Sequence, residues 1–179
     1  MLRDSVFMRK LILHPQCESG PVTSVEAEIA PAQGGCSARF RLHGDMSKIR
    51  IPGAESPERR DFLWKTTCFE IFWQPRGGTY YREFNLSPST CWAAYDFDDV
   101  RLNSRDAPAQ LAIDCLVRDG MLELSGEVRS ELPLPADVAL HAIVEDHDGN
   151  IQFWAPDFAE GKPEFHSVVC RDWPVEGSR

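Results

Sequence analysis

The side chains best suited to binding or chemistry are concentrated in one central stretch of the sequence. Arg82, Glu83 and Asn85 lie within a run of aromatic residues, where a plain sheet core would carry Val or Leu. Polar groups in a sheet cost stability unless they are paired or solvated, so their density indicates a face that meets a ligand. With Trp64 or Trp92 as a flat platform, these groups suit a sugar, whose ring has an apolar face and a polar rim. They suit other planar polar ligands as well.

The same residues are also compatible with structural or catalytic roles. Glu70 and Arg82 could form a structural ion pair on a partly covered sheet, because long side chains meet across a diagonal of neighbouring strands. Glu70 and Glu83 could act as the two carboxylates of a glycoside hydrolase. The expected strand pairing places these two on opposite faces, so we predict a site without catalytic residues. The lone His166 fits a structural role beside the aromatic Phe165 equally well.

The expected pairing follows from the turns that separate three successive strands. The loop at 75–79 contains Gly77-Gly78 and should place Phe72 opposite Arg82 and Glu70 opposite Phe84. A slip of one residue would move every side chain of a strand to the other face. One face is then expected to carry Cys68, Glu70, Phe72, Arg82, Phe84, Ala93 and Tyr95. The other is expected to carry Phe69, Ile71, Trp73, Tyr81, Glu83, Asn85, Trp92 and Ala94.

Short strand patterns separated by Gly, Pro and Asn/Asp turns run through the rest of the chain, and none shows the apolar stripe of a long helix. We therefore predict an all-β fold, an antiparallel β-sandwich of about ten strands. The expected strands are one within 1–17, then 22–29, 36–44, 46–51, three within 63–97, and 111–118, 121–128, 138–145, 151–154 and 165–170. The polar loop at 52–61 is long for a compact domain, and we expect it to act as a lid near Trp64.

Whole-chain properties narrow the classes of partner. The 179 residues are expected to form a single domain spanning 1–179. A net charge of −9 argues against nucleic acid, which is bound largely by basic patches. No stretch has the apolar length of a membrane helix, and the N-terminal apolar runs are too interrupted for a signal peptide. The six cysteines form no CxxC pair, so we expect reduced thiols, a cytoplasmic protein and no metal site.

Several segments resemble bacterial DOMON-like domain proteins, relatives of the family 9 carbohydrate-binding modules. They are WKTTCFE at 64–70, YYREFNLSP at 80–88, WAAY at 92–95, VED at 144–146, FWA at 153–155 and GKPEFH at 161–166. The resemblance implies a β-sandwich that binds a small ligand, either a saccharide stacked on tryptophan or haem held by Met and His. For haem, the candidate ligands are Met46, Met121, His43, His141 and His166.

The main prediction is a non-catalytic module that binds a saccharide-like or other polar ring-containing small molecule. The alternative is a haem-binding redox module with haem as a possible cofactor, and a glycoside-processing enzyme is the third possibility. The predicted ligand-binding residues are Trp64, Glu70, Arg82, Glu83, Asn85, Trp92, Tyr95, Trp154 and His166.

Overall fold

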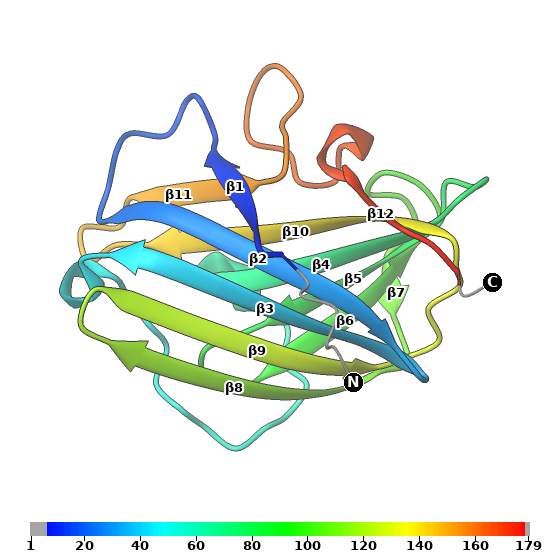
Figure 1. Ribbon diagram of the computed structural model, residues 1–179, viewed down its shortest axis with the longest axis horizontal. Coiled ribbons are helices and arrows are strands. Elements are labelled where there is room, and N and C mark those ends of the chain that lie inside the picture. Colours follow the sequence, from blue (N-terminus) through cyan, green and yellow to red (C-terminus); the bar gives the residue numbers. More distant parts are fainter. Residues whose placement is uncertain (1–6, 178–179) are drawn as a thin grey trace.

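The computed structural model of the protein describes residues 7–177. Within this range the chain forms twelve β-strands and three single-turn 3₁₀ helices (Figure 1). The strands are β1 (Arg9–Leu13), β2 (Val22–Ala32), β3 (Gly35–Gly44), β4 (Cys68–Pro75), β5 (Tyr81–Leu86), β6 (Trp92–Phe97), β7 (Arg105–Asp106), β8 (Gln110–Arg118), β9 (Met121–Arg129), β10 (Ala136–Glu145), β11 (Ile151–Ala155) and β12 (Trp173–Val175). The helices are η1 (Met46–Lys48), η2 (Leu63–Lys65) and η3 (Val168–Cys170). No described helix is long and apolar enough to cross a membrane.

The strands form one continuous antiparallel sheet in the order β7-β6-β5-β4-β10-β11-β1-β2-β3-β9-β8, with β12 paired to β10. The all-β prediction is confirmed. The predicted pair of separate sheets is replaced by a single sheet that curls like a half-barrel. The joining strand is β1, which pairs with β2 through its first residues and with β11 through its last. As a result, β2, β3, β9 and β8 face β4, β5 and β6 across the interior (Figure 1).

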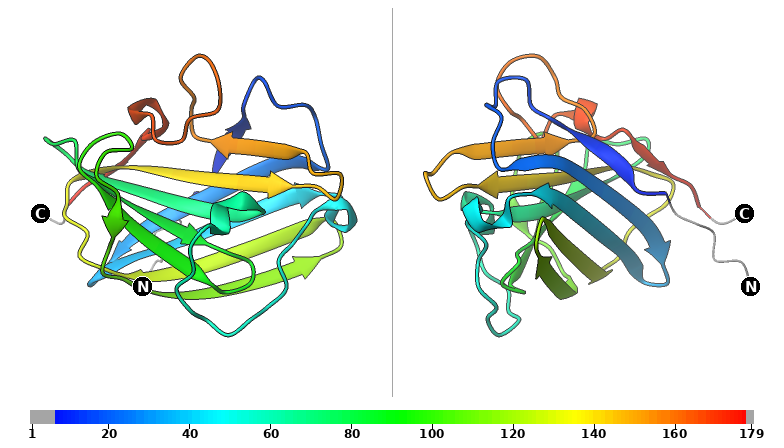
Figure 2. Two further views of the ribbon diagram at one scale, coloured as in Figure 1. Left: turned by 180° about the vertical axis from the view of Figure 1, so that it is seen from behind. Right: turned by 60° about the vertical axis from the view of Figure 1, so that its left-hand side comes forward.

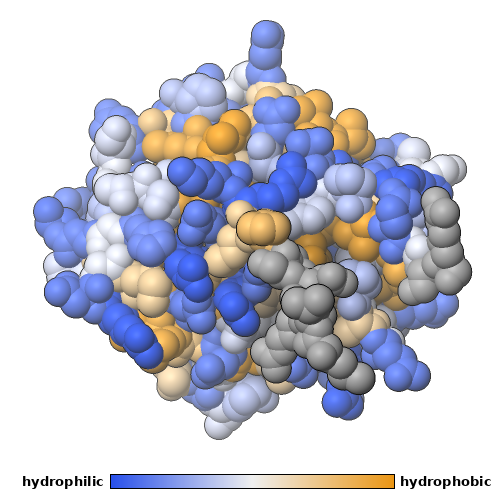
Figure 3. Space-filling view, viewed as in Figure 1, coloured by the Kyte–Doolittle hydropathy of each residue, from blue (hydrophilic) through white to orange (hydrophobic). Residues whose placement is uncertain are grey.

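The main hydrophobic core fills the space between these two parts of the sheet. In β3, Phe40 and Leu42 are fully buried while Arg39 and Arg41 point outward, the alternation that a half-buried strand requires. The ring of Phe40 lies 5.0 Å from that of Phe69 on the opposite part of the sheet. Figure 3 shows the other consequence of this alternation, since hydrophilic side chains spread over the outer face of β2, β3, β9 and β8.

The three central strands are present as predicted, but their pairing differs by one residue. Glu70 pairs with Asn85 and Glu83 with Phe72, where the sequence predicted Phe84 opposite Glu70. On the next strand, Glu83 pairs with Tyr95. Because of this slip, Glu70 and Glu83 share one face of the sheet, so the reason for rejecting them as a pair was wrong.

Other local expectations met different outcomes. The strands expected at 111–118, 121–128, 138–145 and 151–154 are present and form the hairpins β8–β9 and β10–β11, and Gly120 supplies the positive φ of the first turn. The predicted strand at 46–51 is instead η1, because Asp45 caps a helical turn by accepting a hydrogen bond from the backbone of Ser47. The predicted last strand at 165–170 contains η3, and the chain forms its final strand, β12, after it. The predicted first strand lies at β1, and residues 1–6 are outside the described range.

Candidate functional site

A cavity of about 1000 Å³ opens on the side of β4, β5 and β6 that faces away from the main core. Figure 2 (left) views the molecule from this side, with η2 in front of the strands and the segment between β11 and β12 above them. Its floor consists of side chains of the sheet: Glu70, Glu83, Tyr95, Phe97, Ile143, Ile151 and Phe153. Its walls come from η2, β7 and the connecting segments: Asp61, Phe62, Trp64, Lys65, Arg101, Ser104, Arg105, Asp106, Pro163, Phe165 and His166.

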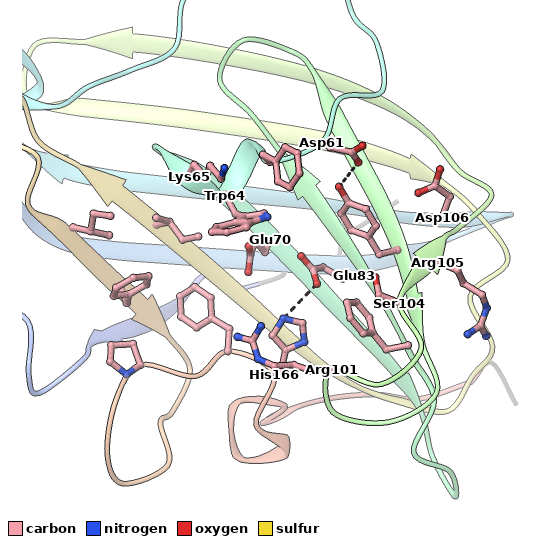
Figure 4. Close-up of a pocket in the computed structure, with 18 residues that line it drawn as sticks. Asp61, Trp64, Lys65, Glu70, Glu83, Arg101, Ser104, Arg105, Asp106 and His166 are labelled. Carbon is pink, nitrogen blue, oxygen red and sulfur yellow. Dashed lines mark hydrogen bonds and ion pairs between the residues drawn. The ribbon is translucent and has the colours of Figure 1, made fainter.

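Trp64 stands at the mouth of the cavity on η2, immediately before β4 (Figure 4). Its side chain is 46% exposed, although the indole is the largest apolar side chain of the set. Phe62 stands beside it with ring centroids 6.4 Å apart and adopts a left-handed backbone (φ 63°), which turns the chain into η2. An exposed aromatic pair at the rim of a cavity provides a surface on which a ring can stack.

Two buried carboxylates lie at the bottom of the cavity, diagonal to each other on neighbouring strands. Glu70 is 3% exposed and Glu83 is 5% exposed. Glu83 accepts a hydrogen bond of 2.7 Å from Asn85 Nδ2. Burial raises the pKa of Glu83 to about 7. Burial, followed by the charge of Glu83, raises the pKa of Glu70 well above its usual value.

His141 of β10 lies directly across from Glu70 and is fully buried. Its ring stacks on Phe165 at 4.0 Å and meets the edge of Phe72. Burial, and then the nearby His166 and Arg171, hold the pKa of His141 well below its usual value. The Nδ1 atom lies 3.5 Å from Glu70 Oε2. Burial thus disfavours the charged form of each partner in this contact.

A second histidine lies near the other carboxylate and takes part in a hydrogen-bond chain. The hydroxyl of Tyr81 lies 2.5 Å from Nδ1 of His166 and accepts a hydrogen bond from the backbone N–H of Arg101. If the hydroxyl donates to Nδ1, the hydrogen of His166 is on Nε2, which lies 3.7 Å from Glu83 Oε2. Burial lowers the pKa of His166 to about 4, so the ring is neutral at pH 7.

The predicted site residues divide between the two faces of the sheet. Trp64, Glu70, Glu83, Tyr95 and His166 line the cavity. Asn85 lies beneath it, with Nδ2 on Glu83 and a buried Oδ1 that has no partner among the described residues.

Arg82, Trp92 and Trp154 lie on the core side, contrary to prediction. Arg82 is held by Asp96 and not by Glu70, because the one-residue slip turns it to the opposite face. Trp92 packs against the main core, and Trp154 is a buried member of it. None of these three side chains lines the cavity.

The candidate haem ligands are dispersed over the described structure. Met46 belongs to the main core, Met121 begins β9, and His43 lies on β3 near Glu26. The cavity lining contains His166 and no methionine. The predicted Met/His pair is therefore not brought together around one space, and the residues present do not fit a haem held in that way.

Several lining residues were not predicted because they come from loops far apart in the sequence. Arg101 and Phe165 meet at the cavity only because the segments after β6 and β11 fold over the same sheet face. Asp61 accepts a 2.6 Å hydrogen bond from the hydroxyl of Tyr95, which fixes the loop before η2 against β6. His141 was named from the sequence only as a candidate haem ligand, and its place beside Glu70 follows from the β4–β10 pairing.

Comparisons with known proteins inform the fold alone. No family model matches the chain, and no curated protein sequence is detectably related. One similar solved structure is a Bacteroides uniformis protein to which carbohydrate binding has been ascribed. The similarity has a TM-score of 0.59 at 14% identity and covers 93% of this chain and 84% of that chain. The chain therefore has an all-β fold like that of this protein, and the narrower DOMON-like assignment stays a prediction.

Proposed function

We propose that the protein is a non-catalytic module that binds a small, ring-containing polar ligand of saccharide type in the cavity above β4, β5 and β6. The observation that carries the proposal is the combination of an exposed aromatic surface at Trp64 with the buried carboxylates Glu70 and Glu83 in one space. A sugar ring needs both, because its faces are apolar and its edges carry hydroxyl donors.

Two further facts support this proposal. The cavity volume of about 1000 Å³ accommodates a ligand of one to a few rings. Carbohydrate binding has also been ascribed to a protein that shares the fold over most of its length. At 14% identity the likeness carries no information about individual residues, so the proposal depends on the cavity.

Isothermal titration of the purified protein with mono- and oligosaccharides tests the proposal. We expect saturable binding with a stoichiometry near one, weakened when Trp64 is replaced by Ala. Absence of heat or thermal stabilisation across neutral, acidic and amino saccharides would overturn it.

A hydrolytic function is the second candidate, because Glu70 and Glu83 share the cavity floor. Glycoside hydrolysis requires one carboxyl group that is protonated near neutral pH and one that is ionised. The raised pKa of Glu70 and the value of about 7 for Glu83 are compatible with that division. Incubating oligosaccharides with the protein and measuring new reducing ends separates the two functions. Turnover that disappears in both E70Q and E83Q would replace the binding-module proposal.

A further inference from the structure

The carboxyl group of Glu70 accepts no hydrogen bond from the described residues, although most polar side chains around the cavity have partners. Its carboxylate is buried yet faces the cavity (Figure 4), and its one near polar neighbour among the described residues is the neutral His141 at 3.5 Å. Glu83 is satisfied on one side only, by Asn85 on Oε1. The Glu70 oxygens and Oε2 of Glu83 accept no hydrogen bond from the described residues and are not enclosed, so a donor placed in the cavity can reach them.

Two of the three Lys and Arg side chains that line the cavity are held by carboxylates other than Glu70 and Glu83. Arg101 makes a two-point contact with Glu164 at 2.8 and 2.9 Å, and Arg105 bonds to Asp98 at 2.7 Å. Lys65 is exposed at the rim, with Nζ 4.5 Å from the centroid of Phe62.

The aromatic lining adds a second feature of a cation site. Trp64, Tyr95, Phe97 and Phe165 surround the same space as the two carboxylates. Aromatic faces attract a cation through the ring quadrupole, and the attraction is strongest where water is excluded. The cavity thus offers carboxyl oxygens at its base and aromatic faces around them.

We propose that the cavity selects a ligand bearing a protonated amine, such as an amino sugar, and that the ammonium group binds between Glu70 and Glu83. This inference rests on the proposed function and specifies its ligand class. An ammonium group has three donors, enough to reach both carboxylates. Its positive charge also balances the negative charge of the carboxylates when they ionise.

Binding of such a ligand should release protons. Without ligand, burial favours the protonated form of Glu70, and the pKa of Glu83 is about 7. A bound ammonium stabilises both ionised forms and so lowers their pKa values. The titratable and charged groups near the pair are the thiol of Cys68, Tyr81, Tyr95, His141, His166, Arg101 and Arg171. Burial keeps both histidines neutral at pH 7, so neither supplies the positive charge that the ammonium group of the ligand would bring to Glu70 and Glu83.

The test compares glucosamine, N-acetylglucosamine and glucose, together with short chitosan and chitin oligosaccharides, by titration calorimetry. N-acetylation removes the charge while keeping the ring. We expect the amine forms to bind about tenfold or more tightly than the acetylated forms, the effect of one charge-assisted contact. Repeating the titration at pH 7 in two buffers of different ionisation enthalpy should show proton release for the amine forms alone.

Two variants test whether Glu70 is the source of the amine preference and of the proton release. E70Q should abolish the amine preference and reduce proton release, while D137N, which changes a carboxylate of β10 that is paired with Arg76 and does not line the cavity, should keep both. The wild-type proton count tests the inference even if E70Q fails to fold. Equal affinity for amine and acetylated ligands, or amine binding without proton release, overturns the inference and leaves the proposed function standing. If no saccharide of either kind binds, the proposed function itself fails.

Discussion

Arg82 and Asp96 join β5 and β6 through a two-point ion pair on the core side of the sheet, with Nε–Oδ1 and Nη2–Oδ2 distances of 2.7 and 2.9 Å. Both residues are buried, and Tyr80 donates a third hydrogen bond to Asp96. The pair accounts for the presence of an arginine in a central strand. Its position at the end of the core, beside Ser130, makes it a structural element and not part of the cavity.

Replacing Asp96 with Asn should therefore destabilise the fold without changing the affinity for the ligand. It leaves the Arg82 charge buried with fewer partners, and we expect a loss of about 3 kcal/mol in unfolding free energy, the lower end for a broken buried pair. Urea denaturation measures the loss. As a control, E28Q removes a 3.4 Å contact with Arg39 at the surface and should change stability little. Equal stability of D96N and wild type would contradict this role.

The two tryptophans predicted as platforms should behave differently from each other. W64A removes an exposed ring at the cavity mouth, so binding should weaken by about 1–3 kcal/mol with little change in stability. W92A removes a ring packed on the main core and should lower the melting temperature instead. Calorimetric binding and thermal unfolding of both variants check the contrast. Loss of binding in a folded W92A variant, together with normal binding in W64A, would place the ligand on the core side of the sheet and contradict our proposal.

Gly126 marks a close approach between the two facing parts of the sheet. A Cβ atom built there would lie 2.3 Å from Cδ2 of Leu86, a fully buried side chain of β5. G126A should thus overpack the core and cost about 1–3 kcal/mol of unfolding free energy. Gly78, in the turn before β5, has open space around it, so G78A serves as the matched control. Adding L86A to G126A should cost less than the two single changes summed, as measured by a double-mutant cycle.

Glu83 should make the fold less stable as the pH rises. Its pKa is about 7 in the folded protein, above the usual 4.5, so the folded state holds a proton that the unfolded state has lost. Its favourable contribution is complete below pH 4.5 and is lost as the pH rises through about 7. E83Q should therefore gain stability relative to wild type between about pH 5 and pH 8. Denaturation curves across this interval, with E160Q as an exposed control, measure the difference. A constant difference would mean that Glu83 titrates normally.

The strand content of the protein was accessible from its sequence, because alternation and turn residues are local signals. The hairpin at Gly120 and the three strands of the central stretch follow from them directly. Pairing register was not accessible, because the turn at 75–79 accommodates loops that differ by one residue. Charge offered a clue, since the observed register sets Arg82 opposite Asp96.

The cavity was only partly accessible for the same reason. Glu70, Glu83, Tyr95 and His166 were identified by type, but their shared location depends on the register and on loops that cross the sheet. Trp154 shows the limit of composition, since its sequence context resembles a binding segment while its ring belongs to the core.

In β4 and in β5, alternate residues lie on opposite faces of the sheet, one facing the main core and the other facing the cavity. Phe69, Ile71 and Phe84 pack inward between the two parts of the sheet, whereas Glu70 and Glu83 face the cavity. Substitutions in one set leave the other set's contacts largely intact. The side chains on the cavity face of these strands can therefore change, and with them the ligand, while the side chains on the core face stay the same and maintain the fold. A sheet of this kind can acquire new binding specificities without losing its structure.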